Sequence, residues 1–284
     1  MKVPTIFFGA SNYVLPLIEF LSSHYDLKLV VTTEKSTGVV PSYCIANNIP
    51  YLSVHTLKDA AIQSKLASLN TSFAILADFG LLIPQSVLDI FPKGIINIHP
   101  SLLPELRGPT PGTSAILHGK TTTGVTIMLL DHQLDHGPLL GQVESEIKPD
   151  DTSATLYPRL FQDGTSLLKK LLPDYLEGKI TPQEQEHTKA TFTEPHLTRE
   201  SGFIDFDQPP TLEHDLLERK IRAYFPWPGV WTKVINPASH LNGKIIKLLP
   251  KNLLQVEGKK PMSPKDFLNG YPEMKDWIEK IIKN

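Results

Sequence analysis

Short apolar stretches alternate with segments of helical spacing along the first hundred residues, and this alternation limits most strongly what the chain can fold into. Five stretches are short, rich in β-branched residues and predict strands: 3–8, 27–32, 51–54, 73–77 and 94–99. Four intervening segments predict helices: 13–22, 42–47, 57–69 and 84–91. Strands that alternate with helices predict an α/β fold with a Rossmann-like, doubly wound, mostly parallel sheet. The continuous apolar strands fit burial on both faces of that sheet.

The remainder of the chain predicts a hairpin, a long helix and a smaller β-rich part. We expect a helix at 110–118, paired strands at 124–130 and 139–147, and a helix that Thr152 caps and that continues to about Leu172. Beyond a stretch without periodicity, further elements are predicted: a helix at 213–224 and short strands at 230–234, 244–249 and 253–256. We therefore expect two domains, a larger one at 1–190 and a small one at 205–284, with 191–204 as a linker.

Composition excludes several classes of protein. The chain has 284 residues, of which 40% are hydrophobic and 20% charged, as in an ordinary globular protein. It begins without the pattern of a signal peptide, and no apolar run approaches the ~20 residues of a membrane span, so we expect a cytoplasmic protein without membrane contact. The single cysteine, Cys44, excludes an internal disulfide and a thiolate zinc cluster, and predicts a small, partly buried side chain rather than a nucleophile.

Asn97 and His99 stand two residues apart at the end of an apolar strand, in the segment NIHPSLLPELRG (97–108). Side chains two apart on a strand share a face, and open α/β sheets bind their ligands at the carboxyl ends of strands. Buried polar side chains need partners, and a ligand can supply one. Taken alone, an Asn-x-His pattern more often marks a satisfied core pair than a functional site.

A second polar group strengthens the functional interpretation. In LLDHQLDHGPLL, Asp135 follows Asn97 by one helix and one strand, which we interpret as a βαβ crossover that brings both loops to one sheet edge. A carboxylate beside an imidazole and an amide donor suits acyl transfer to an amine, in which a proton leaves and an oxyanion develops. Metal binding by His132, Asp135 and His136 is a weaker alternative, because their spacing does not converge three ligands, and we expect no metal.

NIHPSLLPELRG together with LDHGPLL resembles the folate-dependent formyltransferases. The resemblance implies that Asn97, His99 and Asp135 are the catalytic residues and that 10-formyltetrahydrofolate is the co-substrate. FFGAS (7–11) is similar to the opening strand and turn of that family. The implied folate-contacting residues lie in FGLLIP and in the turn after His99: Phe79, Gly80, Leu81, Leu82, Ile83, Pro84, Ser101, Leu102, Leu103 and Pro104.

The C-terminal part resembles the branch of the family that formylates initiator methionyl-tRNA. The resemblance rests on FPWPGVWT (225–232), NGKIIKL (242–248) and EGKKPMSPKDFLNG (257–270). It implies methionyl-tRNA as partner, a role in translation initiation and, we expect, a monomer. Residues 221–284 carry eleven Lys and Arg against five Asp and Glu, which permits an anionic partner. Weaker acceptor or tRNA contacts are expected at Gly9, Ser11, Lys35, Arg107, Lys244, Lys259 and Lys260.

Two departures from this branch keep alternatives open. The basic loop after the second strand is reduced to TTEKSTGVVPSY, with Lys35 as its one cation, and the C-terminal barrel is shortened because only PKN separates Leu249 from Leu253. An unclosed remnant is therefore expected, since a barrel needs enough strands to remove its edges. The alternatives are formyl transfer to another amine such as a nucleotide-linked amino sugar, hydrolysis of the formyl donor, and non-catalytic binding of folate or RNA.

Overall fold

The computed structural model describes residues 2–34, 38–207, 214–237 and 239–282. The chain divides into two compact units, of which the first comprises Met1–Pro111, Thr122–Glu146 and Tyr157–Thr193. The second comprises Gly112–Thr121, Ile147–Leu156 and Glu194–Asn284. Because short segments near 115 and 150 belong to the second unit, its residues come from three separate parts of the chain.

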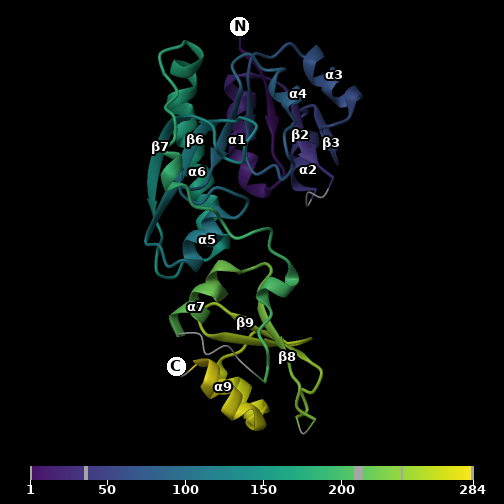
Figure 1. Cartoon of the computed structure of the whole chain (residues 1–284). Coiled ribbons are helices and arrows are strands. Elements are labelled where there is room, and N and C mark those ends of the chain that lie inside the picture. Colours follow the sequence, from purple (N-terminus) through teal and green to yellow (C-terminus); the bar gives the residue numbers. More distant parts are fainter. Residues whose placement is uncertain (1, 35–37, 208–213, 238, 283–284) are drawn as a thin grey trace. The chain divides into compact units, whose positions relative to one another are not determined.

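The first unit is built on a seven-stranded sheet with the order β3-β2-β1-β4-β5-β6-β7 (Figure 1). Its strands are β1 Pro4–Phe8, β2 Asp26–Thr33, β3 Tyr51–Val54, β4 Ala74–Leu76, β5 Ile95–His99, β6 Thr122–Leu129 and β7 Leu139–Glu146. The first five are parallel, whereas β6 is antiparallel to β5 and β7 is antiparallel to β6. The predicted mostly parallel sheet and the predicted hairpin are therefore confirmed.

Helices cover both faces of this sheet. They are α1 Leu15–His24, α2 Val39–Ala46, α3 Ala60–Ser68, α4 Gln85–Leu88 and α6 Ser153–Leu176. Helix α1 begins two residues after the predicted start at residue 13, because the Ser11 side chain accepts the Tyr13 amide and caps a short 3-10 turn, Asn12–Val14, which runs into α1. Helix α3 starts later than expected because Asp59 accepts the Ala61 amide and fixes its beginning.

Strand β5 has two different faces because side chains alternate along a strand. Ile98 contacts the position of Gly164 in α6, so Ile98 and Ile96 face that helix. Ile95 belongs to the apolar cluster on the opposite face, which also includes Leu66 of α3 and Val87 of α4. By the same alternation, Asn97 and His99 lie on the face of Ile95, and they interrupt an otherwise apolar layer.

The second unit contains a three-stranded antiparallel sheet with the order β10-β9-β8. Its elements are α5 Pro111–Leu117, α7 His214–Ala223, β8 Val230–Lys233, β9 Ile245–Leu249, β10 Leu253–Val256, α8 Pro264–Gly270 and α9 Lys275–Ile282. Helix α9 buries Trp277, whose ring stacks on Phe206 with centroids 5.6 Å apart. With three paired strands among the described residues, the sheet does not close, as the short sequence between β9 and β10 predicted.

The three chain segments of the second unit are joined by buried hydrogen bonds. The hydroxyls of Thr113 and Ser153 lie 3.0 Å apart, and Ser153 donates to the Ala223 carbonyl at 2.5 Å. Arg222 donates to the Asp151 carbonyl at 3.0 Å. None of the helices in the described part of the chain is long and apolar enough to cross a membrane.

Cys44 should serve as a probe of unfolding. The thiol is fully buried on α2, and burial raises its pKa to about 11. Because the thiolate is the reactive form, we expect the native protein to react with Ellman's reagent at pH 8 at least ~100-fold more slowly than the protein unfolded in guanidinium chloride. The check is the rate of thionitrobenzoate release under both conditions, and rapid stoichiometric labelling of the native protein would contradict the burial of Cys44.

Candidate functional site

A ligand crevice is expected where β1 and β4 lie side by side, because the crossovers leave these two strands in opposite directions. The strand order β3-β2-β1-β4-β5 makes this the topological switch point of the sheet. The chain after β1 carries Gly9 and Ser11, and the chain after β4 carries the FGLLIP segment. The Ala10 amide donates to the Asp78 carbonyl at 3.0 Å and joins the two turns.

Asn97, His99 and Asp135 come together beside this crevice. Asn97 Nδ2 lies 3.4 Å from Asp135 Oδ1, and His99 Nδ1 lies 3.7 Å from Asp135 Oδ2. All three residues are at most 8% exposed. An amide donor, an imidazole and a carboxylate therefore meet in an environment where electrostatic interactions are stronger than in water.

The route by which Asp135 reaches the site differs from the predicted crossover. Because β6 is antiparallel to β5, its end at Leu129 pairs with Ile96, at the beginning of β5. The loop from 130 to 138 therefore folds back along β5 to bring Asp135 to Asn97. Gly137 allows this return, since a Cβ there would lie 2.1 Å from the Leu129 carbonyl oxygen. The predicted neighbourhood was correct, but the βαβ reasoning behind it was wrong.

The Asp135 carboxylate is held by the backbone as well as by side chains. The Gly108 amide donates to Asp135 Oδ2 at 2.8 Å. Gly108 adopts a φ of +121° and Asp135 a φ of +46°, so both backbones lie in a region that is uncommon for non-glycine residues. Such conformations are maintained only where the surrounding structure enforces them, and here they direct the amide and the carboxylate toward each other.

The hydrogen bond of His99 fixes which ring nitrogen carries a proton. Nε2 lies 2.9 Å from the Leu106 carbonyl, which can only accept, so Nε2 is a donor. Nδ1 is therefore the nitrogen that faces Asp135 and that can either bind a proton or release one. This arrangement is suited to proton transfer next to a carboxylate.

The turn after His99 is fixed in place by β6. The Thr126 hydroxyl donates to the Ser101 carbonyl at 2.6 Å and accepts from the Leu103 amide at 3.0 Å. Ser101 and Leu103 are buried, whereas Leu102 and Pro104 are partly exposed. The turn therefore forms a rigid wall, and its two partly exposed members are the better placed to meet a ligand.

The FGLLIP segment (79–84) combines a buried anchor with an exposed apolar side chain. Phe79 is 2% exposed and packs edge-on against Phe8 with ring centroids 5.4 Å apart, so its ring belongs to the core. Leu82 is 85% exposed, and Gly80 has a φ of +76°.

Arg107, which the sequence predicted as an acceptor or tRNA contact, is buried in the interior of the first unit. It is 5% exposed, and its guanidinium donates to Gln185 Oε1 at 2.6 and 3.2 Å and to His187 Nδ1 at 2.8 Å. Gln185 was not singled out by the sequence, because it lies in a polar stretch without periodicity. It is nevertheless 5% exposed and donates to the carbonyls of Asp135 and Gly137.

The remaining predicted contacts belong to other parts of the chain. Lys244, Lys259 and Lys260 are exposed on the second unit, and Lys35 lies outside the described residues. His136 is engaged by Asp131 at 2.6 Å, while Asp135 faces Asn97, His99 and Gly108. No group of three or more His, Cys, Asp or Glu suited to a metal ion occurs within the described ranges.

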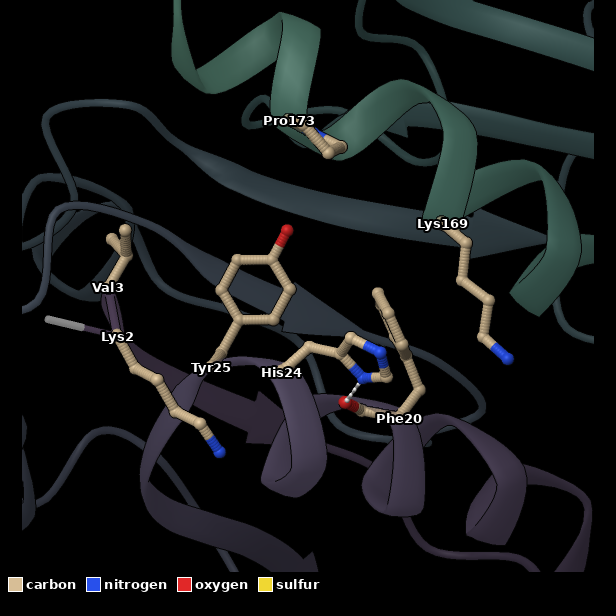
Figure 2. Close-up of a pocket in the computed structure, with 7 residues that line it drawn as sticks. All are labelled: Lys2, Val3, Phe20, His24, Tyr25, Lys169 and Pro173. Carbon is tan, nitrogen blue, oxygen red and sulfur yellow. Dashed lines mark hydrogen bonds between the residues drawn. The ribbon is translucent and has the colours of Figure 1, made fainter.

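An open hollow of about 610 Å³ lies elsewhere on the first unit (Figure 2). Its lining comes from the start of the chain, from α1 and from α6, and includes Lys2, His24, Tyr25 and Lys169. The Lys2 ammonium donates to the carbonyls of Ser22 and Ser23, so it already has partners. None of the catalytic candidates lines this hollow, and the chemistry is better sought at Asp135.

Comparison with known proteins decides the family. Residues 20–172 match the family model described as formyl transferase. The chain belongs to the formyl transferase family. Similar relatives include the methionyl-tRNA formyltransferase of Roseiflexus sp. (strain RS-1), 45% identical over 82% of this chain and 73% of that protein. That of Geobacillus thermodenitrificans (strain NG80-2) is 33% identical over 93% of each chain. The resemblance seen in the sequence motifs is thereby confirmed.

Solved structures share the fold of this formyl transferase. A sugar N-formyltransferase from Shewanella sp. FDAARGOS_354 superposes with a TM-score of 0.68 at 20% identity, over 87% of this chain and 96% of that one. An N-formyltransferase from Helicobacter canadensis, in complex with folinic acid and dTDP-3-aminofucose, gives a TM-score of 0.64 at 19% identity, over 89% and 94%. At these identities the likeness establishes the fold alone.

We expect Asp135→Asn and His99→Ala each to lose most formyl-transfer activity, by about 100- to 10,000-fold in kcat, because each removes a group that exchanges protons with the reactants. Asp135→Asn keeps the side-chain shape and an oxygen for the Gly108 amide, so its unfolding midpoint should change little. Circular dichroism and single-turnover kinetics measure both effects.

The matched control for that test is Asp89→Asn, which makes the same chemical change at the exposed residue that caps the end of helix α4. It should retain full activity. Full turnover by purified Asp135→Asn or His99→Ala would refute the assigned roles.

Proposed function

We propose that this protein transfers the formyl group of 10-formyltetrahydrofolate to the amino group of initiator methionyl-tRNA. The observation that carries the proposal is the convergence of Asn97, His99 and Asp135, buried together beside the switch point of the sheet. Relatives of 33–45% identity that cover most of the chain carry that name. Such a protein acts in translation initiation and therefore in the cytoplasm, and we expect it to act as a monomer.

Each member of the trio has a role in the proposed reaction. The methionyl amine attacks the formyl carbon, and the carbonyl oxygen gains negative charge. The Asn97 amide and a protonated His99 Nδ1 stabilise that oxygen, because donors in a water-poor site act strongly on developing charge. Asp135 holds the His99 proton and takes part in removing the proton from the amine. As the tetrahedral intermediate collapses, the bond between the formyl carbon and N10 breaks, N10 takes up the proton that the amine released, and tetrahydrofolate leaves.

The folate co-substrate is proposed to bind between the FGLLIP segment and the turn after His99. Its flat, largely apolar rings would contact exposed Leu82 and partly exposed Leu102, while backbone groups of the two segments bind its polar edge. Phe79 and Leu103 would support the pocket from the core rather than contact the rings directly. Gly9 and Ser11, across the switch point, would border the acceptor amine.

A second candidate acceptor is a nucleotide-linked amino sugar. The three-stranded sheet of the second unit is a specific reason to keep it, since little of a barrel remains to meet a tRNA. The simple hydrolysis of the donor and the non-catalytic binding of folate or RNA require no acceptor. An intact trio supports catalysis over mere binding, because an amide donor, an imidazole and a carboxylate in contact suit formyl transfer to an amine.

A single assay separates these functions. The purified protein is incubated with 10-formyltetrahydrofolate and, in parallel, with methionyl initiator tRNA, with a nucleotide 4-amino sugar or with buffer. We expect release of tetrahydrofolate and formation of formylmethionyl-tRNA with the charged tRNA alone, and uncharged tRNA serves as the control. Turnover with the amino sugar or with buffer alone, but not with charged tRNA, would overturn the proposal.

The basic residues of the second unit predict a salt-dependent interaction with tRNA phosphates. Replacing exposed Lys259 and Lys260 by alanine should lower the slope of log Kd against log salt by roughly 1 to 2, because each phosphate contact releases about one counterion. Filter binding of charged tRNA at several salt concentrations measures that slope. The control replaces Lys58 and Lys65, exposed at and before α3, and should leave it unchanged. Equal slopes for wild type, the Lys259 and Lys260 variant and the Lys58 and Lys65 variant would argue against phosphate contacts by Lys259 and Lys260.

A further inference from the structure

A short irregular segment holds together the two loops that form the site. We call residues 183–193 the clasp. At one end, Gln183 exchanges two backbone hydrogen bonds with Leu139, at 2.7 and 2.8 Å, just after the Asp135 loop. At the other end, the Thr191 carbonyl accepts from the Arg107 amide at 2.9 Å, and the Thr193 amide donates to the Arg107 carbonyl at 2.8 Å. The clasp therefore bridges the Asp135 loop and the turn that follows His99.

Gln185 is the side chain through which the clasp contacts the Asp135 loop. Its Nε2 donates to the Asp135 carbonyl at 2.9 Å and to the Gly137 carbonyl at 2.8 Å, so both of its amide hydrogens are used. The first of these carbonyls belongs to Asp135 itself, whose φ is +46°. Gln185 thus provides the hydrogen-bond donor for the backbone carbonyl of Asp135, the one residue of the trio that is not on a regular strand.

Arg107 fixes the orientation of Gln185. The guanidinium donates twice to Gln185 Oε1, which forces the amide nitrogen toward the Asp135 loop and excludes a flipped side chain. In the described part of the chain, this buried cation contacts no acidic side chain. Its remaining partner is His187 Nδ1 at 2.8 Å, and the His187 ring stacks on His136 at 3.9 Å between centroids. A buried charge without an ion pair is costly, and this cost is consistent with a functional requirement.

We propose that Gln185, oriented by Arg107, is a positioning residue that sets the placement of Asp135 against His99 and Asn97. The chain of hydrogen bonds runs from the guanidinium through the amide to the Asp135 backbone, and each bond polarises the next. The inference rests on the proposed function, because its readout is formyl transfer. In this proposal Arg107 supports the site from the interior and does not contact the acceptor. Neither residue touches the reacting atoms in this arrangement.

Gln185→Glu separates positioning from mere stability. A glutamate still accepts from Arg107, and forms an ion pair with it, but it loses both donors to the Asp135 and Gly137 carbonyls and places an oxygen against them. Because Arg107 gains a partner while the loop loses its support, we expect an unfolding midpoint within a few degrees of wild type. We also expect kcat lower by about 100-fold and KM values for donor and acceptor unchanged within about twofold, since small displacements of catalytic groups act mainly on kcat.

Two further variants complete the experiment. Gln185→Met keeps the volume and removes both hydrogen-bonding functions, so it should lose kcat similarly and provides the test if the glutamate variant does not fold. Gln183→Glu makes the same chemical change two residues away on an exposed side chain and should behave as wild type. A kcat within twofold of wild type in folded Gln185→Glu or Gln185→Met would overturn the proposal. A loss of kcat in Gln185→Glu that is no larger than the loss in Gln183→Glu would also overturn it.

The wild-type protein distinguishes failure of this inference from failure of the proposed function. If wild type formylates none of the offered acceptors, the proposed function fails. The positioning role is then decided by the ring-nitrogen NMR signals of His99. We expect these signals to shift in Gln185→Glu and to match wild type in Gln183→Glu, because Asp135 moves in the first variant alone. Unchanged His99 signals in folded Gln185→Glu would refute the positioning role independently of any substrate.

Discussion

The burial of the Asp135 carboxylate is the constraint on which the rest of the site depends. A carboxylate that is 8% exposed needs hydrogen bonds or opposite charge to remain ionised. Here the Gly108 amide, the Asn97 amide group and the His99 ring face its two oxygens. Each of these comes from a different position along the chain, so the carboxylate can be accommodated only when the sheet, the turn after β5 and the loop after β6 are all in place.

The same requirement explains why the surroundings of the site are rigid. Thr126 fixes the turn that begins at Ser101, and the clasp fixes the loop that carries Asp135. Proton transfer and oxyanion stabilisation depend on donors that are oriented before the substrate arrives. In the proposed reaction the supporting hydrogen bonds therefore contribute to function, although their members need not contact the substrate.

The sequence predicted the fold well where the pattern is local. Five parallel strands appear within a few residues of their expected positions, because a continuous apolar run has one favourable environment, a sheet covered on both faces. The ends of helices were less predictable. Ser11 caps a 3-10 turn that precedes α1, and α3 begins at Ala60 because Asp59 is oriented as a cap. Such choices depend on hydrogen bonds of one side chain and leave no periodic signal.

What the sequence by itself determined is the shared face of Asn97 and His99, because alternation along a strand is a property of the backbone, and the family motif that pairs them with Asp135. What only the tertiary structure decided is how Asp135 reaches them. The antiparallel β6 and the returning loop were not visible in the order of elements. The interior position of Arg107 and the role of Gln185 were also hidden, since their contacts join residues 48 to 80 positions apart. Interactions of that range depend on the packed arrangement of the loops, which no local pattern of residue types encodes.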